Sequence, residues 1–296
     1  SNYVAAIVAG CICPAGADID TLGIQITANG RHKAVLLYDT EQSEVQLFKN
    51  VSNLLARAKQ PDKPDELKAF CLTGMSRKER LNAIVQSMDK FYYQYGGIQL
   101  VVIDGIADLV KSANDEAESV AVIDELYRLA GIYNTCILCV LHFVPNGLKL
   151  RGHLGSELQR KAATILSIEK DEEPTKSVVK ALKVRDGSPL DVPLMLFAWD
   201  KEAGMHVYKG EKPREEKEKR KERELVNVAR DIFGRQTRIT YIDLCEQLQQ
   251  VLDIKERTAK SYIRFMRERD IITKDTANQS CFVIGSYHLQ RNASCP

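Results

Sequence analysis

The stretch Ile98–Val110, IQLVVIDGIADLV, decides the fold of this chain. Five apolar residues interrupted only by Gln99 lead into Asp104. A run this short and this rich in β-branched residues is typical of a strand buried in a parallel sheet. Ligands of open α/β sheets bind beyond the carboxyl ends of the strands, so an acid in this place can face a ligand through a metal ion. The alternative is that Asp104 caps a helix beginning near Ile106.

Strand and helix patterns alternate on both sides of this stretch. Further strand patterns lie at 33–38, 70–72, 135–142, 164–169, 177–184 and 195–199, with a final turn at 200–204. Helical patterns lie at 3–12, 45–55, 77–93 and 119–130, the first of them apolar almost all round. Alternation at this spacing predicts an α/β fold, a mostly parallel sheet with helices on both faces.

The composition indicates a soluble protein. The chain has 296 residues, 44% hydrophobic and 28% charged, enough for one α/β domain and a smaller second one. No apolar run approaches the ~20 residues of a membrane helix, and the first residues lack the basic region of a signal peptide. We therefore expect a cytoplasmic protein with no membrane partner. A net charge of +2 means that any nucleic-acid surface must be local.

Polar side chains follow three of the predicted strands. Glu41 comes three residues after one strand, Asp104 ends the second and His142 ends the third. If the strands are neighbours, this arrangement suits metal-assisted phosphoryl transfer: Asp104 holds magnesium, Glu41 orients and deprotonates water, and His142 senses the γ-phosphate. The alternatives are that Glu41 is an acid favoured at a helix start and that His142 only ends a strand.

Five segments, taken in order, carry a family resemblance: LLYDTEQS (36–43), LVVIDGIADL (100–109), VLHFVPNG (140–147), LRGHLGSELQRKAATILSI (150–168) and VKALKVRDG (179–187). The ordered set, more than any one segment, resembles the RecA-type ATPase core. It is most similar to RepA-like hexameric helicases and related ATPases of plasmids and mobilisable elements. The resemblance covers most of residues 1 to about 208 and implies ATP and Mg²⁺ as cofactors.

The resemblance assigns roles to single residues. It puts the catalytic base on Glu41, the Walker B aspartate on Asp104 and the histidine that ends the sensor strand on His142. Arg151 begins an RG-x-x-x-S segment that in the family lies near nucleotide or DNA.

The same resemblance implies an assembly of several copies. Lys183 and Arg185 match a basic pair that reaches into the neighbouring subunit's site, which makes the protein a homo-oligomer, a hexamer if it follows the helicases. An arginine suits this role because its planar fork stabilises charge on γ-phosphate oxygens. The alternative is that both side chains are merely solvated.

One family feature is missing from the sequence. No G-x-x-x-x-G-K-[ST] loop, which binds phosphates through backbone N–H groups and a lysine, occurs in the chain. The family places this loop just before a buried helix, and here Ser1 takes the position of its last residue, a cofactor-binding one. We expect an N-terminally incomplete version of a longer ATPase that by itself hydrolyses ATP negligibly. The alternative is a degenerate relative that binds no nucleotide.

The sequence predicts three parts: an ATPase core at 1–210, a charged linker or exposed helix at 211–224 and a small domain at 225–290. The last part has helical patterns at 225–233, 241–251 and 255–269 and a hairpin pattern at 271–284, the order of a winged helix-turn-helix. Its third helix carries basic residues on one face, which could enter a DNA major groove: Arg257, Lys260, Arg264 and Arg267. The alternatives are a solvated face or a protein-docking module.

Two function classes remain open. The first is a DNA-associated ATPase, a helicase or DNA-remodelling motor, that serves replication or mobilisation of a plasmid or mobile element. The second is a non-catalytic DNA-binding adaptor or replication initiator with a degenerate core.

Overall fold

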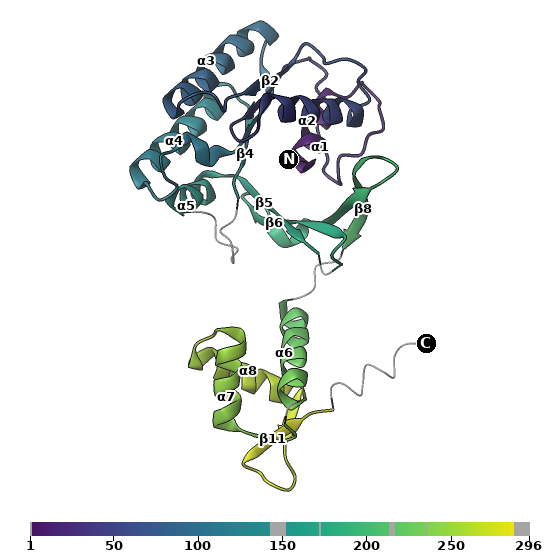
Figure 1. The fold of residues 1–296 in the computed structure, drawn as a ribbon, viewed down its shortest axis with the longest axis vertical. Coiled ribbons are helices and arrows are strands. Elements are labelled where there is room, and N and C mark those ends of the chain that lie inside the picture. The colour runs from purple at the N-terminus through teal and green to yellow at the C-terminus, as the bar shows by residue number, and fades with distance from the viewer. Residues whose placement is uncertain (1, 143–151, 172, 213–216, 235, 287–296) are drawn as a thin grey trace. The chain divides into compact units, whose positions relative to one another are not determined.

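The computed structural model describes residues 2–142, 152–171, 173–212, 217–234 and 236–286 (Figure 1). The chain divides into two compact units, Ser1–Pro213 and Arg214–Pro296, each described by itself below. Among the described residues, no helix has the length and apolar character needed to cross a membrane.

The first unit contains a parallel four-stranded sheet. Its strands are β1 (Ala34–Asp39), β2 (Leu67–Cys71), β3 (Ile98–Asp104) and β4 (Cys136–Val140), in the order β2-β1-β3-β4. All three pairings are parallel. β1 is buried along its whole length, as expected for a strand inside a sheet covered on both faces. The predicted α/β fold is therefore confirmed and is consistent with a RecA-like core.

Helices cover both faces of this sheet, as the sequence predicts. α1 (Asn2–Ile12) and α2 (Glu44–Arg57) pack with Val35, Leu37, Leu100 and Val102 in one core. The alternate strand residues Leu36, Tyr38, Val101 and Ile103 pack in a second core with α3 (Arg77–Tyr95) and α4 (Glu116–Ile132). Figure 1 shows α1 and α2 on one side of the sheet and α3 and α4 on the other. Each apolar strand thus serves two cores.

Helix ends follow local sequence. Ser76 and Glu79 form a capping box at the start of α3, and Gly96 in the left-handed conformation ends that helix. Ser43 caps α2 and Asp115 caps α4 through side-chain acceptors. These caps fix where the chain leaves each strand end and returns as a helix.

The later strands correct one prediction. β5 (Thr164–Lys170), β6 (Lys176–Val184), β7 (Leu194–Asp200) and β8 (Met205–Lys212) form a separate antiparallel sheet instead of extending the parallel one. The connections between them are too short for the crossover that parallel pairing needs. The sequence analysis also missed β8, placing only a turn at 200–204. The remaining helix of this unit is α5 (Gly152–Lys161), and two short 3₁₀ turns lie at Ile106–Leu109 and Pro189–Asp191.

The described part of the second unit, residues 217–234 and 236–286, has three helices and a small antiparallel sheet. The helices are α6 (Lys217–Phe233), α7 (Tyr241–Leu252) and α8 (Glu256–Glu268). The strands are β9 (Ile239–Thr240), β10 (Ile272–Lys274) and β11 (Cys281–Ile284), in the order β10-β11-β9. One apolar core joins all three helices to the sheet and includes Leu225, Leu244, Ile263 and Phe282. The winged helix-turn-helix interpretation of this unit stays a prediction.

The charged segment 211–224 contains regular structure at both ends. β8 extends to Lys212, and α6 begins at Lys217. Lys, Glu and Arg are good helix formers, so a run of these residues extends a helix that its apolar end anchors in a core. Leu225 and Val228 provide that anchor.

Candidate functional site

The sheet order brings three of the predicted residues to one edge. β1, β3 and β4 are adjacent, and Asp39 at the end of β1 is the register partner of Asp104 at the end of β3. Glu41 follows β1 by two residues and His142 follows β4 by two. The Nε2 atom of His142 lies 3.4 Å from Oε2 of Glu41. Glu41, Asp104 and His142 thus share the carboxyl edge of the parallel sheet, where ligands of such sheets bind.

Asp104 ends a strand and does not cap a helix. The short 3₁₀ turn that follows has Gly105 at its cap position and no side-chain cap bond. The alternative interpretation of Asp104 as a helix cap is therefore wrong, and its carboxylate is left for the sheet edge.

Burial raises the pKa of the Asp104 carboxyl, the nearby acids Asp39 and Glu41 raise this pKa further, and His142 opposes them. Carboxylates gathered in this way attract a divalent cation, because the cation relieves both their desolvation and their mutual repulsion. Among the described residues, no group of three or more His, Cys, Asp or Glu side chains could hold a metal ion by itself. Mg²⁺ at phosphate sites is held by one or two carboxylates, with water and phosphate as its other ligands. Asp104 fits that form of site.

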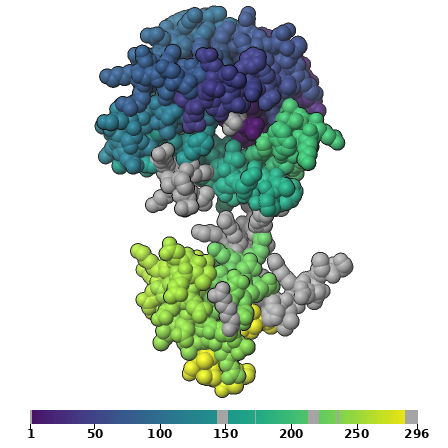
Figure 2. Space-filling model, in the orientation of Figure 1, coloured from purple at the N-terminus to yellow at the C-terminus, as the bar shows by residue number. Residues whose placement is uncertain are grey.

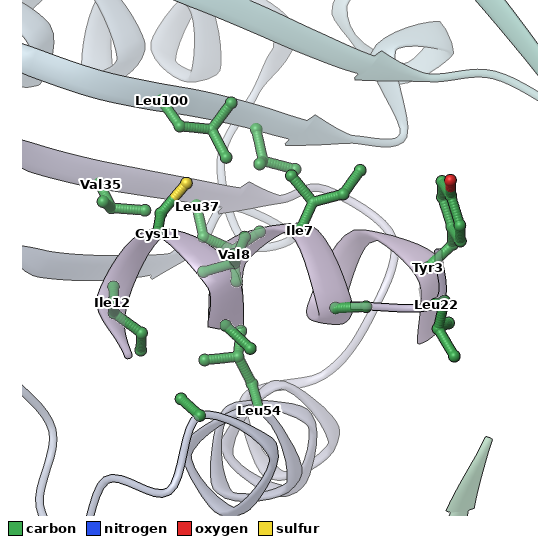
Figure 3. Close-up of a cluster of buried hydrophobic side chains, with 14 of the residues drawn as sticks. Tyr3, Ile7, Val8, Cys11, Ile12, Leu22, Val35, Leu37, Leu54 and Leu100 are labelled. Atoms are coloured by element: carbon green, nitrogen blue, oxygen red, sulfur yellow. The ribbon is translucent and has the colours of Figure 1, made fainter. Parts of the chain in front are cut away.

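The start of α1 lies at the same edge. In Figure 3, α1 runs against the direction of β1 and β3, so the end marked by Tyr3 is on the side toward which the strands point. Figure 2 shows a hollow in the surface of the first unit between the dark blue α2 region and the green β8 region, with purple N-terminal residues inside it. The first N–H groups of a helix have no partner within the helix and favour anions. The first turn of α1 and the acids suited to a metal ion thus lie at the same edge of the sheet.

Two predicted residues cannot be placed. Ser1, predicted to bind phosphate, and Arg151, predicted to lie near nucleotide or DNA, are outside the described residues.

Lys183 and Arg185 contact α5. Lys183 Nζ donates to the carbonyl oxygens of Gln159, at 2.6 Å, and Arg160, at 3.3 Å. Arg185 Nη2 donates to the carbonyl oxygen of Lys161 at 3.1 Å. The last carbonyls of a helix carry partial negative charge and lack partners within the helix, so two cations there stabilise its end. Within one chain the pair caps α5, and a role at a neighbouring subunit's site stays a prediction.

The basic face of α8 is exposed and partly paired with acids. Arg257, Lys260, Arg264 and Arg267 are all exposed. Lys260 forms an ion pair with Glu256 at 2.7 Å, and Arg264 forms one with Glu268 at 2.8 Å. Exposed pairs of this kind contribute little stability, so a phosphate could replace either acid.

Comparison with known protein families agrees with the geometry of the first unit. Residues 5–146 match a family model described as an AAA domain. This match supports a P-loop ATPase family. No curated protein matches the chain. The AAA-type region contains most of α1, β1 to β4 and the edge residues Glu41, Asp104 and His142. Domains of this type bind nucleotide and usually Mg²⁺, whereas Lys183, Arg185 and the second unit lie outside the matched range.

Sequence reasoning missed three residues at this edge of the AAA-type region. Asp39 accepts the N–H of Glu41, Thr40 donates its hydroxyl to the Gly105 carbonyl, and Gly105 lies against the Glu41 side chain. The only hint in the sequence was the DTE triplet directly after an apolar strand. Its meaning depends on the register between β1 and β3, which the sequence does not specify.

Proposed function

We propose that this protein is a DNA-associated ATPase of the RecA/RepA-like type, a helicase or DNA-remodelling motor that serves replication or mobilisation of a plasmid or mobile element. The observation that carries the proposal is the position of Glu41, Asp104 and His142 at one edge of the parallel sheet, inside the range that matches an AAA domain. We further propose a cytoplasmic homo-oligomer.

In this proposal the acids divide the work of ATP hydrolysis. Asp104 holds Mg²⁺ directly or through water, and Glu41 orients a water molecule and accepts its proton. When bound there, Mg²⁺ would supply positive charge that stabilises the phosphates of the nucleotide. His142 lies within 3.4 Å of Glu41, so a change at the γ-phosphate could be passed to Glu41 through this contact.

The proposal gives Lys183 and Arg185 a role between subunits. Their bonds to the carbonyls of α5 are exposed and can be exchanged for phosphate oxygens. In the assembled protein, these cations would leave α5 and stabilise charge on a neighbour's nucleotide.

The second unit would supply the contact with DNA. The exposed cations of α8 neutralise phosphates if this helix enters a groove. Replacing Lys260 and Arg264 together with Ala should weaken duplex binding and reduce its salt dependence by about two contacts' worth of counterion release. Replacing the acids Glu256 and Glu268 with Gln is the matched control, because it removes the pairing acids and should strengthen binding. Equal affinities and slopes in all three proteins would mean that this face does not bind DNA.

The test of the whole proposal is ATP hydrolysis by the full-length gene product, measured with and without DNA. We expect Mg²⁺-dependent hydrolysis that DNA stimulates. DNA binding without any hydrolysis would favour the adaptor alternative.

The shared site is tested by mixing subunits. Arg185→Ala and Glu41→Gln proteins should each be inactive, and a mixture should recover part of the activity if base and cation come from different subunits. No recovery between subunits shown to exchange would contradict the shared site.

A further inference from the structure

The carboxylate of Asp39 holds the backbone that carries Glu41. Its Oδ1 atom accepts the N–H groups of Glu41, at 3.0 Å, and Gln42, at 2.9 Å. Asp39 is buried, with 2% of its surface exposed, and both bonds are partly buried. Hydrogen bonds to a charged acceptor are stronger than those between neutral groups. The chain therefore leaves β1 in a fixed turn.

Thr40 joins this turn to the end of β3. Its backbone N–H donates to the carbonyl oxygen of Asp104 at 3.1 Å. Its Oγ1 lies 3.1 Å from the same oxygen and 2.8 Å from the carbonyl oxygen of Gly105. One hydroxyl has one proton, so that proton is shared between these two acceptors. Thr40 is thus bonded to the carbonyl groups of Asp104 and Gly105, which belong to the peptides on either side of Gly105.

Gly105 lets the Glu41 side chain approach Asp104. A Cβ atom at Gly105 would lie 2.6 Å from Cγ of Glu41 and 2.3 Å from Oγ1 of Thr40. Only a residue without a side chain allows this spacing. The stem of Glu41 therefore rests on the residue that follows Asp104.

The far side of the turn has anchors of its own. The thiol of Cys71 donates to the carbonyl oxygen of Gln42 at 3.3 Å, and Asn50 Nδ2 donates to Oε1 of Gln42 at 2.9 Å. These bonds come from β2 and α2. The Glu41 side chain, 37% exposed, thus extends from a turn that is bonded to β3, β2 and α2.

We propose that Asp39 and Thr40 are positioning residues that set the place of the Glu41 carboxylate relative to Asp104. The proposal rests on the proposed ATPase function. Neither residue touches the nucleotide in this account, because both act through the backbone and stem of Glu41. A displacement of about 1 Å at a reacting group can lower turnover about 100-fold, so a turn with this many bonds has a direct catalytic use.

The kinetic experiment compares Thr40→Val with Thr40→Ser in the full-length gene product. Val keeps the shape of the side chain and removes its hydroxyl, whereas Ser keeps the hydroxyl. We expect Thr40→Val to lower kcat about 100-fold, with KM for ATP changed less than about threefold. Thr40→Ser should retain most of the wild-type kcat. A normal kcat for Thr40→Val, or a loss confined to KM, would overturn the proposal.

The structural experiment is amide hydrogen exchange, which needs no ATPase activity. Asp39→Ala should speed exchange of the Glu41 and Gln42 amides about tenfold, and Asp39→Asn, which keeps a neutral acceptor, should speed it less. The control is Asp200→Ala, because Oδ1 of Asp200 accepts the N–H groups two and three residues later, at 3.1 Å each, in the turn between β7 and β8. That variant should speed exchange only in its own turn.

The two experiments separate the possible failures. If the wild-type protein hydrolyses no ATP, the proposed function fails, and exchange still decides whether Asp39 holds the turn. Exchange at Glu41 and Gln42 that is unchanged in both Asp39 variants would overturn the positioning role whatever the activity. The fluorescence of Trp199, in β7 of the same unit, verifies that each variant is folded before it is compared.

Discussion

Replacing Gly105 with Ala tests the close approach of β1 and β3 at the sheet edge. Gly105 has a φ of +96°, a conformation that residues with side chains rarely adopt. The added Cβ would lie 2.3 Å from Oγ1 of Thr40, far inside van der Waals contact. Thr40 is buried and bonded to two carbonyl oxygens, so it has no free space into which it can move.

The expected loss of stability has two main parts. The left-handed conformation costs about 1–2 kcal/mol for a residue with a side chain. Forcing a methyl group into a packed place costs about 1–3 kcal/mol more. Ala also lowers the conformational entropy of the unfolded chain, which offsets the loss of stability by about 0.4–1 kcal/mol. We therefore expect the free energy of unfolding of the first unit to fall by about 1–5 kcal/mol.

Substitutions at two other glycines separate the conformational cost from the cost of packing the added methyl group. Gly204 has a φ of +62° and no atom within 4 Å of an added Cβ, so Gly204→Ala carries the conformational cost alone. Gly131 lies in α4, and an added Cβ there also meets nothing within 4 Å. Gly131→Ala should stabilise the unit by up to about 1 kcal/mol.

Urea unfolding followed by tryptophan fluorescence measures all three variants. The chain has one tryptophan, Trp199, and it lies in the first unit, so its signal reports that unit. Gly105→Ala should be the least stable of the three. If it were no less stable than Gly204→Ala, the contact of Gly105 with Thr40 and Glu41 would not be tight, and the account of the edge would be refuted.

Three further changes have expected outcomes of different kinds. Burial raises the pKa of Asp104, so the folded state loses stability as pH rises and this carboxyl becomes ionised. Asp104→Asn carries no charge and should therefore unfold at a higher urea concentration than wild type at pH 7 in metal-free buffer. In acid, where Asp104 is protonated, the two proteins should be equally stable. Ser76→Ala removes the capping box with Glu79 and should lower the free energy of unfolding by about 0.5–2 kcal/mol, measured by Trp199 fluorescence. Met266→Ala in the core of the second unit should destabilise that unit by about 2–5 kcal/mol in circular dichroism, without moving the Trp199 transition.

Much of the first unit follows from its apolar patterns. The run that ends at Asp104 predicted a buried parallel strand, because a strand covered on both faces needs apolar residues at every position. The meeting of Glu41, Asp104 and His142 follows from sequence only if their strands are neighbours, a condition that the sequence leaves open and that the strand order β2-β1-β3-β4 meets. Neighbouring parallel strands then end at the same edge of the sheet.

Other features depend on pairings that the sequence does not specify. The apolar stripe of α2 correctly predicted a helix, yet Val45 and Phe48 in that stripe are 67% and 74% exposed. β8 was not predicted because its residues are mostly half-buried and include charged ones, so its sequence shows neither a continuous apolar run nor a clean alternation of apolar and polar residues. The contacts of Lys183 and Arg185 with α5 arise because β5 and β6 pair in a hairpin that returns the chain to the end of that helix.

The measurement that tests the central claim most directly compares ATP binding and ATP hydrolysis in wild-type and Glu41→Gln forms of the full-length gene product. Gln has the shape of Glu but cannot accept a proton from water. The account predicts that Glu41→Gln binds ATP with Mg²⁺ as wild type does, in calorimetry, and loses turnover by roughly two to four orders of magnitude. Unchanged turnover in this variant would contradict the account, because Glu41 would then not be the base that accepts the proton from water.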